Sequence, residues 1–222
     1  MKSQQEPLET ISHQAEICRF NADVLYRVLL LRIAKQYSPQ EMSFLMGKPL
    51  DFVDKIERLQ NMSFYLDDIV KMNKVLGSSF HIGCFTSSLS PFIKAEKELY
   101  QLSRNVYDDH ITYQLVMCLD HNKTVNVFIL QDNNPLSDYF EHSTEQELAS
   151  LKRIIETLLQ NGYFDCERCP FEIFEKCKSF LSDYIKPRNL YIALTSFTKR
   201  KEHPKLQYKK SKELGYYYIK KD

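Results

Sequence analysis

Residues Arg27 to Gly77 read RVLLLRIAKQYSPQEMSFLMGKPLDFVDKIERLQNMSFYLDDIVKMNKVLG, and the expected fold follows from this stretch. Its apolar residues recur at helical spacing in four short segments. The tetrapeptide SPQE at 38–41 is a capping box, which satisfies free amides at a helix N-terminus. Gly47 can end one helix in the left-handed conformation, and Pro49 can begin the next. Two helices joined by a short turn that contains Gly are typical of a helix-turn-helix.

The stretch resembles the phage-repressor (Cro-like) helix-turn-helix DNA-binding domain family, in the N-terminal part of the chain only. Leu31 and Arg32 fall on the end of the family's first helix, and residues 38–47 fall on its second. Residues 48–58 fall on its recognition helix, and residues 66–77 fall on its fourth helix. The family binds duplex DNA with the third helix in the major groove. The resemblance therefore implies a helix-turn-helix domain at 22–80.

The resemblance implies DNA contacts from the second and third helices. The family usually has a Gln directly after the cap, whereas this chain has Pro39 there and Gln40 next. Leu50 could touch a thymine methyl group, and Asp51 could accept a hydrogen bond from a cytosine amine. The residues expected to contact DNA here are Gln40, Lys48, Leu50, Asp51, Asp54 and Lys55. Because two carboxylates oppose phosphate, a protein-interaction module that uses Leu50 and Phe52 without catalysis remains an alternative.

The segments on either side of this stretch are expected to support it. Leu8, Ile11, Ala15 and Cys18 are spaced to share a helical face, so a leader helix is expected within 1–21. Residues 81–142 should contain a linking helix at 95–103 and a β-hairpin. The two strand-like runs of this hairpin, 111–119 and 124–131, are rich in Val, Ile, Tyr and Phe. The hairpin could pack on helices, form a dimer contact or sense a ligand.

Residues 143–222 are expected to form a basic winged-helix-like domain. A helix should begin at 143 and stop at Gly162, and two more should cover 170–181 and 187–198. Two strands should follow at 206–210 and 216–219. The similarity to a winged helix lies in the order of elements only. The whole chain is therefore expected to be mainly α, with an N-terminal repressor-like helical bundle, a central β-hairpin and this C-terminal unit.

The formal net charge of +1 conceals a strong asymmetry along the chain. Residues 186–222 contain eleven Lys or Arg and three acidic residues, which gives +8, so the remaining residues carry −7. Such asymmetry suggests a polyanionic partner, although a solvated tail would have the same composition. Lysines here would hold phosphates, while interleaved tyrosines could stack on single-stranded bases or face the core. The further DNA-contact candidates are Arg188, Asn189, Thr195, Thr198, Lys199, Arg200, Lys201, Lys205, Lys209, Lys210 and Lys212.

Composition limits the other classes of function. The chain is 43% hydrophobic and 27% charged and lacks an apolar run of about 18 residues, so a cytoplasmic protein without a membrane span is expected. Cys166, Cys169 and Cys177 are weak candidates for zinc ligands, and buried free thiols are the alternative. No cofactor and no catalytic group are expected. The prediction is a sequence-specific DNA-binding protein, a transcriptional regulator that occupies an operator in double-stranded DNA, with homodimerisation left open.

Overall fold

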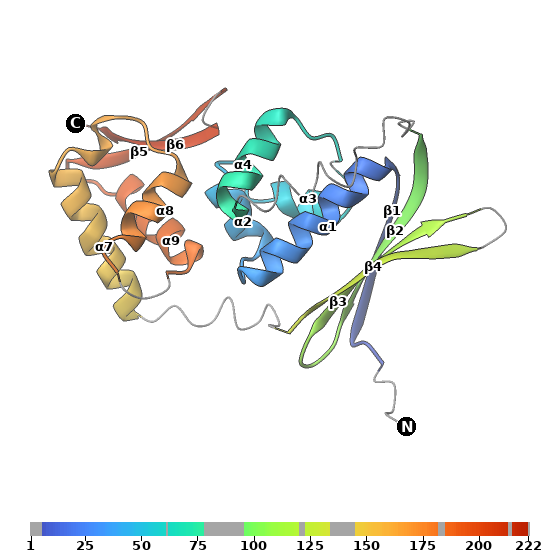
Figure 1. Cartoon of the computed structure of the whole chain (residues 1–222). Coiled ribbons are helices and arrows are strands. Elements are labelled where there is room, and N and C mark those ends of the chain that lie inside the picture. Colours follow the sequence, from blue (N-terminus) through green and yellow to red (C-terminus); the bar gives the residue numbers. More distant parts are fainter. Residues whose placement is uncertain are drawn as a thin grey trace. The chain divides into compact units, whose positions relative to one another are not determined.

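The structure, a computed structural model, describes residues 6–60, 62–77, 96–119, 123–133, 145–181, 185–212 and 215–221. Its contacts divide the chain into two compact units, whose elements are labelled in Figure 1. The N-terminal unit comprises Met1–Ser38 and Phe52–Phe140. The C-terminal unit comprises Pro39–Asp51 and Glu141–Asp222. The short segment 39–51 therefore belongs with the second half of the chain, and the domain limits expected at 21, 80 and 142 stay a prediction.

The prediction of a mainly α chain is wrong. About 45% of the described residues are helical and 29% are in strands. The strands form a four-stranded antiparallel sheet, in the order β1-β2-β3-β4, and a two-stranded sheet. Strand β1 (Glu9–Cys18) occupies most of the expected leader helix, and strand β2 (Lys97–Val106) occupies the expected linking helix.

Strand β1 is stabilised by a partner that lies far away in the sequence. Its inward positions alternate with exposed ones, so the segment also fits the period of two that is typical of a half-buried strand. Ala15 pairs with Tyr100 of β2, which is fully buried. On the other face, Ser12 and Ser103 form a hydrogen bond of 2.9 Å between their hydroxyl groups. Cross-strand pairs of this kind stabilise a sheet.

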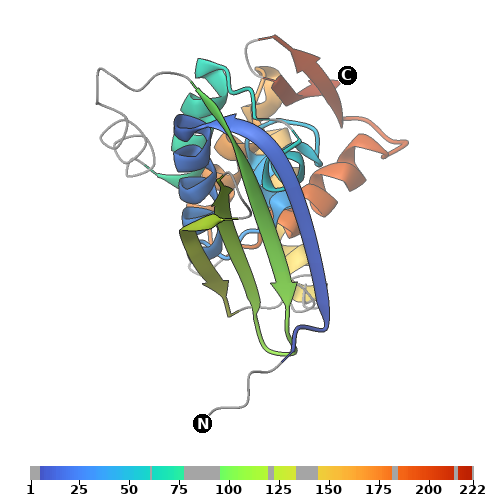
Figure 2. The same cartoon turned by 90° about the vertical axis from the view of Figure 1, so that its right-hand side faces the viewer.

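The predicted central hairpin is confirmed as strands β3 (Ile111–Cys118) and β4 (Thr124–Asp132). Helix α1 (Arg19–Ala34) packs against this sheet, and Figure 2 shows the sheet with α1 behind it. The Tyr26 ring of α1 lies 5.3 Å from the Phe128 ring of β4. Helices α3 (Phe52–Glu57) and α4 (Leu66–Leu76) pack on α1. The core of this unit is therefore shared between helices and a sheet.

The C-terminal unit contains the helices and strands expected near the end of the chain. They are α7 (Glu145–Gln160), the 3-10 helix η1 (Tyr163–Asp165), α8 (Pro170–Lys178), α9 (Pro187–Thr198), β5 (Lys205–Ser211) and β6 (Gly215–Lys221). Pro187 begins α9 as expected, because its fixed φ suits the first helical position. The antiparallel pair β5–β6 packs against α9 through β5.

Helix α2 (Pro39–Leu45) is an integral part of the C-terminal unit, in contact with α8 and α9. The buried Glu41 carboxylate accepts a hydrogen bond of 3.1 Å from the backbone amide of Arg188, at the start of α9. The Phe44 ring lies edge-on to the Tyr191 ring of α9 at 5.4 Å. The helices expected to form one repressor-like bundle are therefore divided, since α1, α3 and α4 belong to the N-terminal unit.

Candidate nucleic-acid interface

The stretch expected to form the recognition helix, 48–58, contains only one short helix. Helix α3 spans Phe52–Glu57, whereas Lys48, Leu50 and Asp51 precede it and belong to the C-terminal unit. Asp54 and Lys55 lie on α3, in the N-terminal unit. A recognition helix presents its base-contacting side chains from one rigid element. The structure does not bring the five expected contact residues together on such an element.

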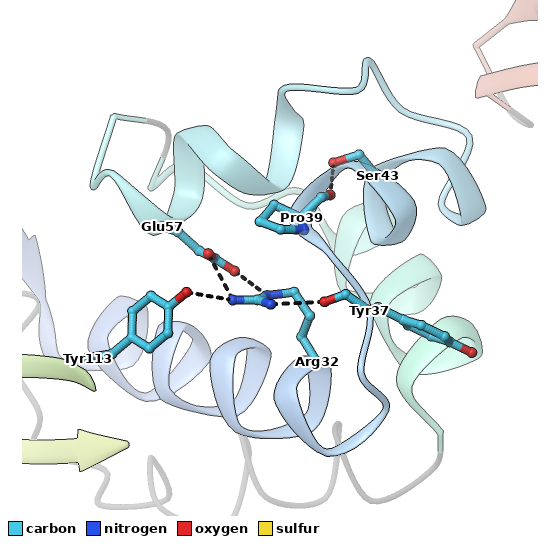
Figure 3. A network of polar contacts seen from close by, with 6 residues as sticks. All are labelled: Arg32, Tyr37, Pro39, Ser43, Glu57 and Tyr113. Carbon is cyan, nitrogen blue, oxygen red and sulfur yellow. Dashed lines mark hydrogen bonds and ion pairs between the residues drawn. The ribbon is translucent and has the colours of Figure 1, made fainter. Parts of the chain in front are cut away.

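A buried ion pair anchors α3 in the N-terminal unit (Figure 3). Arg32 is 1% exposed, and its guanidinium pairs with both carboxylate oxygens of Glu57 on α3. The same guanidinium donates to the Tyr37 carbonyl at 2.9 Å and to the Tyr113 hydroxyl at 3.3 Å. Burial raises the pKa of the Glu57 carboxyl, while the charge of Arg32 opposes that rise. One face of α3 therefore packs in this core and is not available to contact DNA.

The exposed side of α3 carries both signs of charge, with Lys55 exposed beside the Asp54 carboxylate. Asp54 forms an ion pair of 2.9 Å with Arg58, so the carboxylate of one residue offsets the guanidinium of the other. Val53 and Ile56 are fully buried. Sequence reasoning missed the Arg32–Glu57 pair, because the two residues lie 25 positions apart and each is ordinary on a surface helix. Only an Arg within an otherwise apolar helical face could have signalled it.

A different feature stands out in the C-terminal unit, a cavity of about 510 Å³ that we call the tyrosine pocket. Helix α9 supplies Tyr191, Thr195 and Thr198. The hairpin supplies Tyr208, Tyr216 and Tyr218, and the segment after α2 supplies Pro49, Leu50 and Asp51. A volume within roughly 300–1,000 Å³ is typical of small-ligand pockets.

Backbone geometry explains why these side chains converge. Tyr191, Thr195 and Thr198 follow one another at intervals of four and three residues, which places them on one face of α9. In the hairpin, Tyr208 pairs with Tyr218 and Lys210 pairs with Tyr216, so all four side chains share one face of the two strands.

A backbone hydrogen bond ties the segment after α2 to the hairpin. The amide of Tyr216 donates to the Gly47 carbonyl at 2.8 Å. Gly47 has a φ of 64°, a left-handed conformation that glycine adopts without a steric penalty. The glycine expected to close a helix therefore also turns Pro49, Leu50 and Asp51 toward the tyrosines.

The tyrosines form a flat platform rather than a closed box. The rings of Tyr208 and Tyr216 are stacked, with centroids 4.9 Å apart and planes 8° from parallel. Tyr208 is 44% exposed, while its neighbour Tyr218 is 2% exposed. Burial raises the pKa of the Tyr208 and Tyr218 hydroxyls well above the ordinary value, so both phenols stay neutral at physiological pH.

The lysines expected to hold phosphates lie on or beside the elements of this unit: Lys199 and Lys201 follow α9, Lys205, Lys209 and Lys210 lie on β5, and Lys212 follows β5. Lys199, Lys201, Lys209, Lys210 and Lys212 are exposed, and Lys205 is half-buried. Within the described ranges, none of these six forms an ion pair with a carboxylate. Arg200 differs, because it pairs with Glu156 at 2.8 Å. Among the described residues, these six positive charges are therefore not offset by a carboxylate at ion-pair distance, and such charge attracts polyanions.

Strand register separates two neighbouring lysines. Lys210 shares the face of Tyr208 and Tyr216, and its ammonium lies 5.4 Å from the centroid of the Tyr216 ring. Lys209 pairs with Tyr217 on the opposite face. Both side chains are exposed lysines, and they lie on opposite faces of the hairpin. Substituting each one separately therefore compares the two faces at equal loss of charge.

The remaining candidates for DNA contact occupy varied environments. Asn189 is 0% exposed, so the expectation that it faces a groove is corrected: the side chain points into the packed side of α9. Gln40 is exposed on α2. Arg188 is half-buried at the start of α9. Thr195 lines the tyrosine pocket, where sequence reasoning had placed it on a groove-facing helix.

The cysteine cluster shows no metal site within the part of the chain that the structure describes. No group of three His, Cys, Asp or Glu residues is close enough there to hold a metal ion. Cys166 is exposed, Cys169 caps α8, and Cys177 is buried. Burial raises the pKa of the Cys177 thiol to about 12, so the free thiol stays protonated at neutral pH.

Comparison with protein-family models, with curated proteins and with solved structures finds no match to this chain. The resemblance to the Cro-like family therefore rests on the residues of the sequence and stays a prediction. Among the described residues, no helix has the length and apolar character needed to cross a membrane.

Proposed function

We propose that this protein binds DNA through its C-terminal unit and acts by occupying a site, as a regulator of transcription, rather than by catalysis. The observation that carries the proposal is the set of lysines between 199 and 212 that lack carboxylate partners among the described residues, of which Lys210 lies beside the Tyr216 ring of the tyrosine pocket. The phosphate backbone supplies much of the affinity of a protein for DNA, through release of condensed counterions. Charges already paired within the protein contribute less to that release.

The lysines extend from the end of α9 to the turn after β5. Lys199 follows α9, Lys205 begins β5, and Lys212 follows β5. A strand of seven residues spans about 24 Å at about 3.4 Å per residue, which is the length of several nucleotide steps. The hairpin can therefore meet several phosphates together. Such contacts position a protein without specifying sequence, so selectivity is assigned to the tyrosine pocket.

A protein-interaction role is the second candidate, and one observation favours it. Tyr65, Leu66 and Val70 at the start of α4 are 76%, 75% and 46% exposed. Leu66 and Val70 are four residues apart and share one face of the helix. Exposed apolar side chains that cluster on a helix can form the contact with a protein partner. Binding of DNA and binding of a protein would then use different units.

The test is a titration of the full chain against a fluorescein-labelled duplex of about 20 base pairs, followed by fluorescence anisotropy at several KCl concentrations. We expect the logarithm of affinity to fall linearly with the logarithm of salt concentration. Replacing Lys209, Lys210 and Lys212 together by Gln should weaken binding to all duplexes. The salt slope should flatten by roughly 0.9 for each phosphate that the variant no longer neutralises.

A matched control removes the same amount of charge from the N-terminal unit. Lys55, Lys74 and Lys97 are exposed there, and replacing all three by Gln should leave the affinity and the salt slope near those of the natural chain. Equal weakening in the two triple variants would mean that only net charge matters. No measurable binding by the natural chain at low salt would refute the proposal.

A further inference from the structure

We infer that the tyrosine pocket takes one unstacked base of a DNA strand, with the base stacked on Tyr208 and the adjoining phosphates held by Lys210 and its neighbours. The inference rests on the proposed function and deepens it, because it names the part of DNA that the tyrosine pocket binds. A base becomes available where the strand is single or where a base pair opens. Recognition by a groove-bound helix would need no such pocket.

The ring geometry provides the first argument. Tyr208 and Tyr216 already form a parallel stack, and Tyr208 is the exposed member of the tyrosine cluster. A nucleobase is flat and presents the same kind of π face, so it can extend the stack by one ring. Single-strand binding proteins use aromatic platforms in this way. The buried Tyr218 lies 5.0 Å from Tyr208 and supports it from within the unit.

The polar groups of the pocket provide the second argument. Thr195 and Thr198 bring hydroxyl groups to the same cavity as the aromatic rings. The Thr198 hydroxyl donates to the Thr195 carbonyl at 2.9 Å and can still accept a hydrogen bond. Base edges carry both donors and acceptors. A purely apolar pocket would leave those donors and acceptors without hydrogen-bond partners. The mixture of aromatic faces and hydroxyls therefore suits a base better than it suits a hydrocarbon chain.

Ring geometry and Lys210 favour a base over another ligand that aromatic pockets bind, a quaternary ammonium ion. Such cations are held by aromatic faces around the charge. Here the principal rings are parallel, and Lys210 places an ammonium 5.4 Å from the Tyr216 ring. Lys210 would repel a second cation and attract a phosphate joined to the base, whereas the Asp51 carboxylate in the lining acts in the opposite direction. The parallel rings therefore favour a flat base, with its phosphate on the Lys210 side.

The experiment compares two labelled strands of about 12 nucleotides against the full chain by anisotropy. One is ordinary single-stranded DNA of mixed sequence, and the other has the same phosphates and sugars without bases. We expect the ordinary strand to bind roughly 10-fold more tightly, equivalent to about 1.4 kcal/mol. Tyr208→Ala should remove this preference and leave affinity for the abasic strand unchanged, while Tyr208→Phe should keep it. Lys210→Gln should weaken the binding of both strands more than Lys209→Gln does.

The outcomes separate this inference from the proposed function. Equal binding of the two strands by the natural chain would overturn the base pocket and leave DNA binding intact. Failure of both strands and of the duplex to bind would overturn the proposed function itself. Disappearance of the preference in Tyr208→Phe as well would exclude stacking as its cause. Competition by tetramethylammonium, or tighter binding of the same strand as RNA, would show that the pocket serves another ligand.

Discussion

Arg32 is the residue that most constrains the N-terminal unit. It is one of the largest fully buried side chains, and its charge is met by Glu57 and by oxygens of Tyr37 and Tyr113. Removal of one partner from a buried ion pair leaves the other charge uncompensated in a region of low dielectric. Replacement of both partners by apolar groups avoids that penalty. The pair therefore joins α1, α3 and β3. A single substitution in it should lower stability, because it leaves one buried charge without its partner.

Substituting Arg32→Met is expected to lower the free energy of unfolding by about 3–5 kcal/mol, because the Glu57 carboxylate then lacks its charged partner. The double variant Arg32→Met, Glu57→Leu should recover much of that stability. Urea denaturation of the natural chain, both single variants and the double variant gives the coupling energy. Additive effects of the two substitutions would contradict the buried pair.

Cys177 should make stability depend on alkaline pH. Because burial raises its pKa to about 12 from an ordinary value of 9.0, the folded chain holds the thiol proton more tightly than the unfolded chain. This contribution is fully present below pH 9 and is lost as the pH rises toward 12. A shift of that size corresponds to at most on the order of 4 kcal/mol.

The measurement is the free energy of unfolding by urea between about pH 8 and pH 11, for the natural chain and for Cys177→Ala. Buried tyrosines contribute in the same direction, since burial also raises the pKa of Tyr100 to about 12. The variant should therefore lose less stability over this range without losing all pH dependence. Parallel curves for the two chains would show that the thiol does not contribute.

Among the helices and strands, local signals predicted some elements well and others badly. Helix α9 begins at Pro187 and ends at Thr198 as predicted, because a proline start and an apolar stripe are properties of the segment itself. Strand β1 lies where the spacing of apolar residues predicts a helix. Its apolar positions fit both periods, and the partner that decides between them is β2, which pairs Glu9 with Val106. Contact with that partner cannot be read from ten residues.

Substitution of two carboxylates distinguishes which element contacts DNA. Asp51 lines the tyrosine pocket, whereas Asp54 lies on α3 and pairs with Arg58. Asp51→Asn should raise the affinity for DNA by several-fold, because one negative charge near the phosphates is removed. Asp54→Asn should leave affinity near that of the natural chain. The anisotropy titration used for the lysine variants measures both, and a rise with Asp54→Asn alone would assign the contact to α3 instead.

Across the whole molecule, features that depend on neighbours along the chain could be read from the sequence. They include the central hairpin, the three late helices, the basic hairpin and the charge excess at 186–222. Tertiary packing alone assigned α2 to the C-terminal unit and α3 to the N-terminal one. The reason is that burial of Glu41 and of Glu57 depends on partners at Arg188 and Arg32. The tyrosine pocket exists for the same reason, since only packing brings residues near 50, 195 and 216 to one cavity.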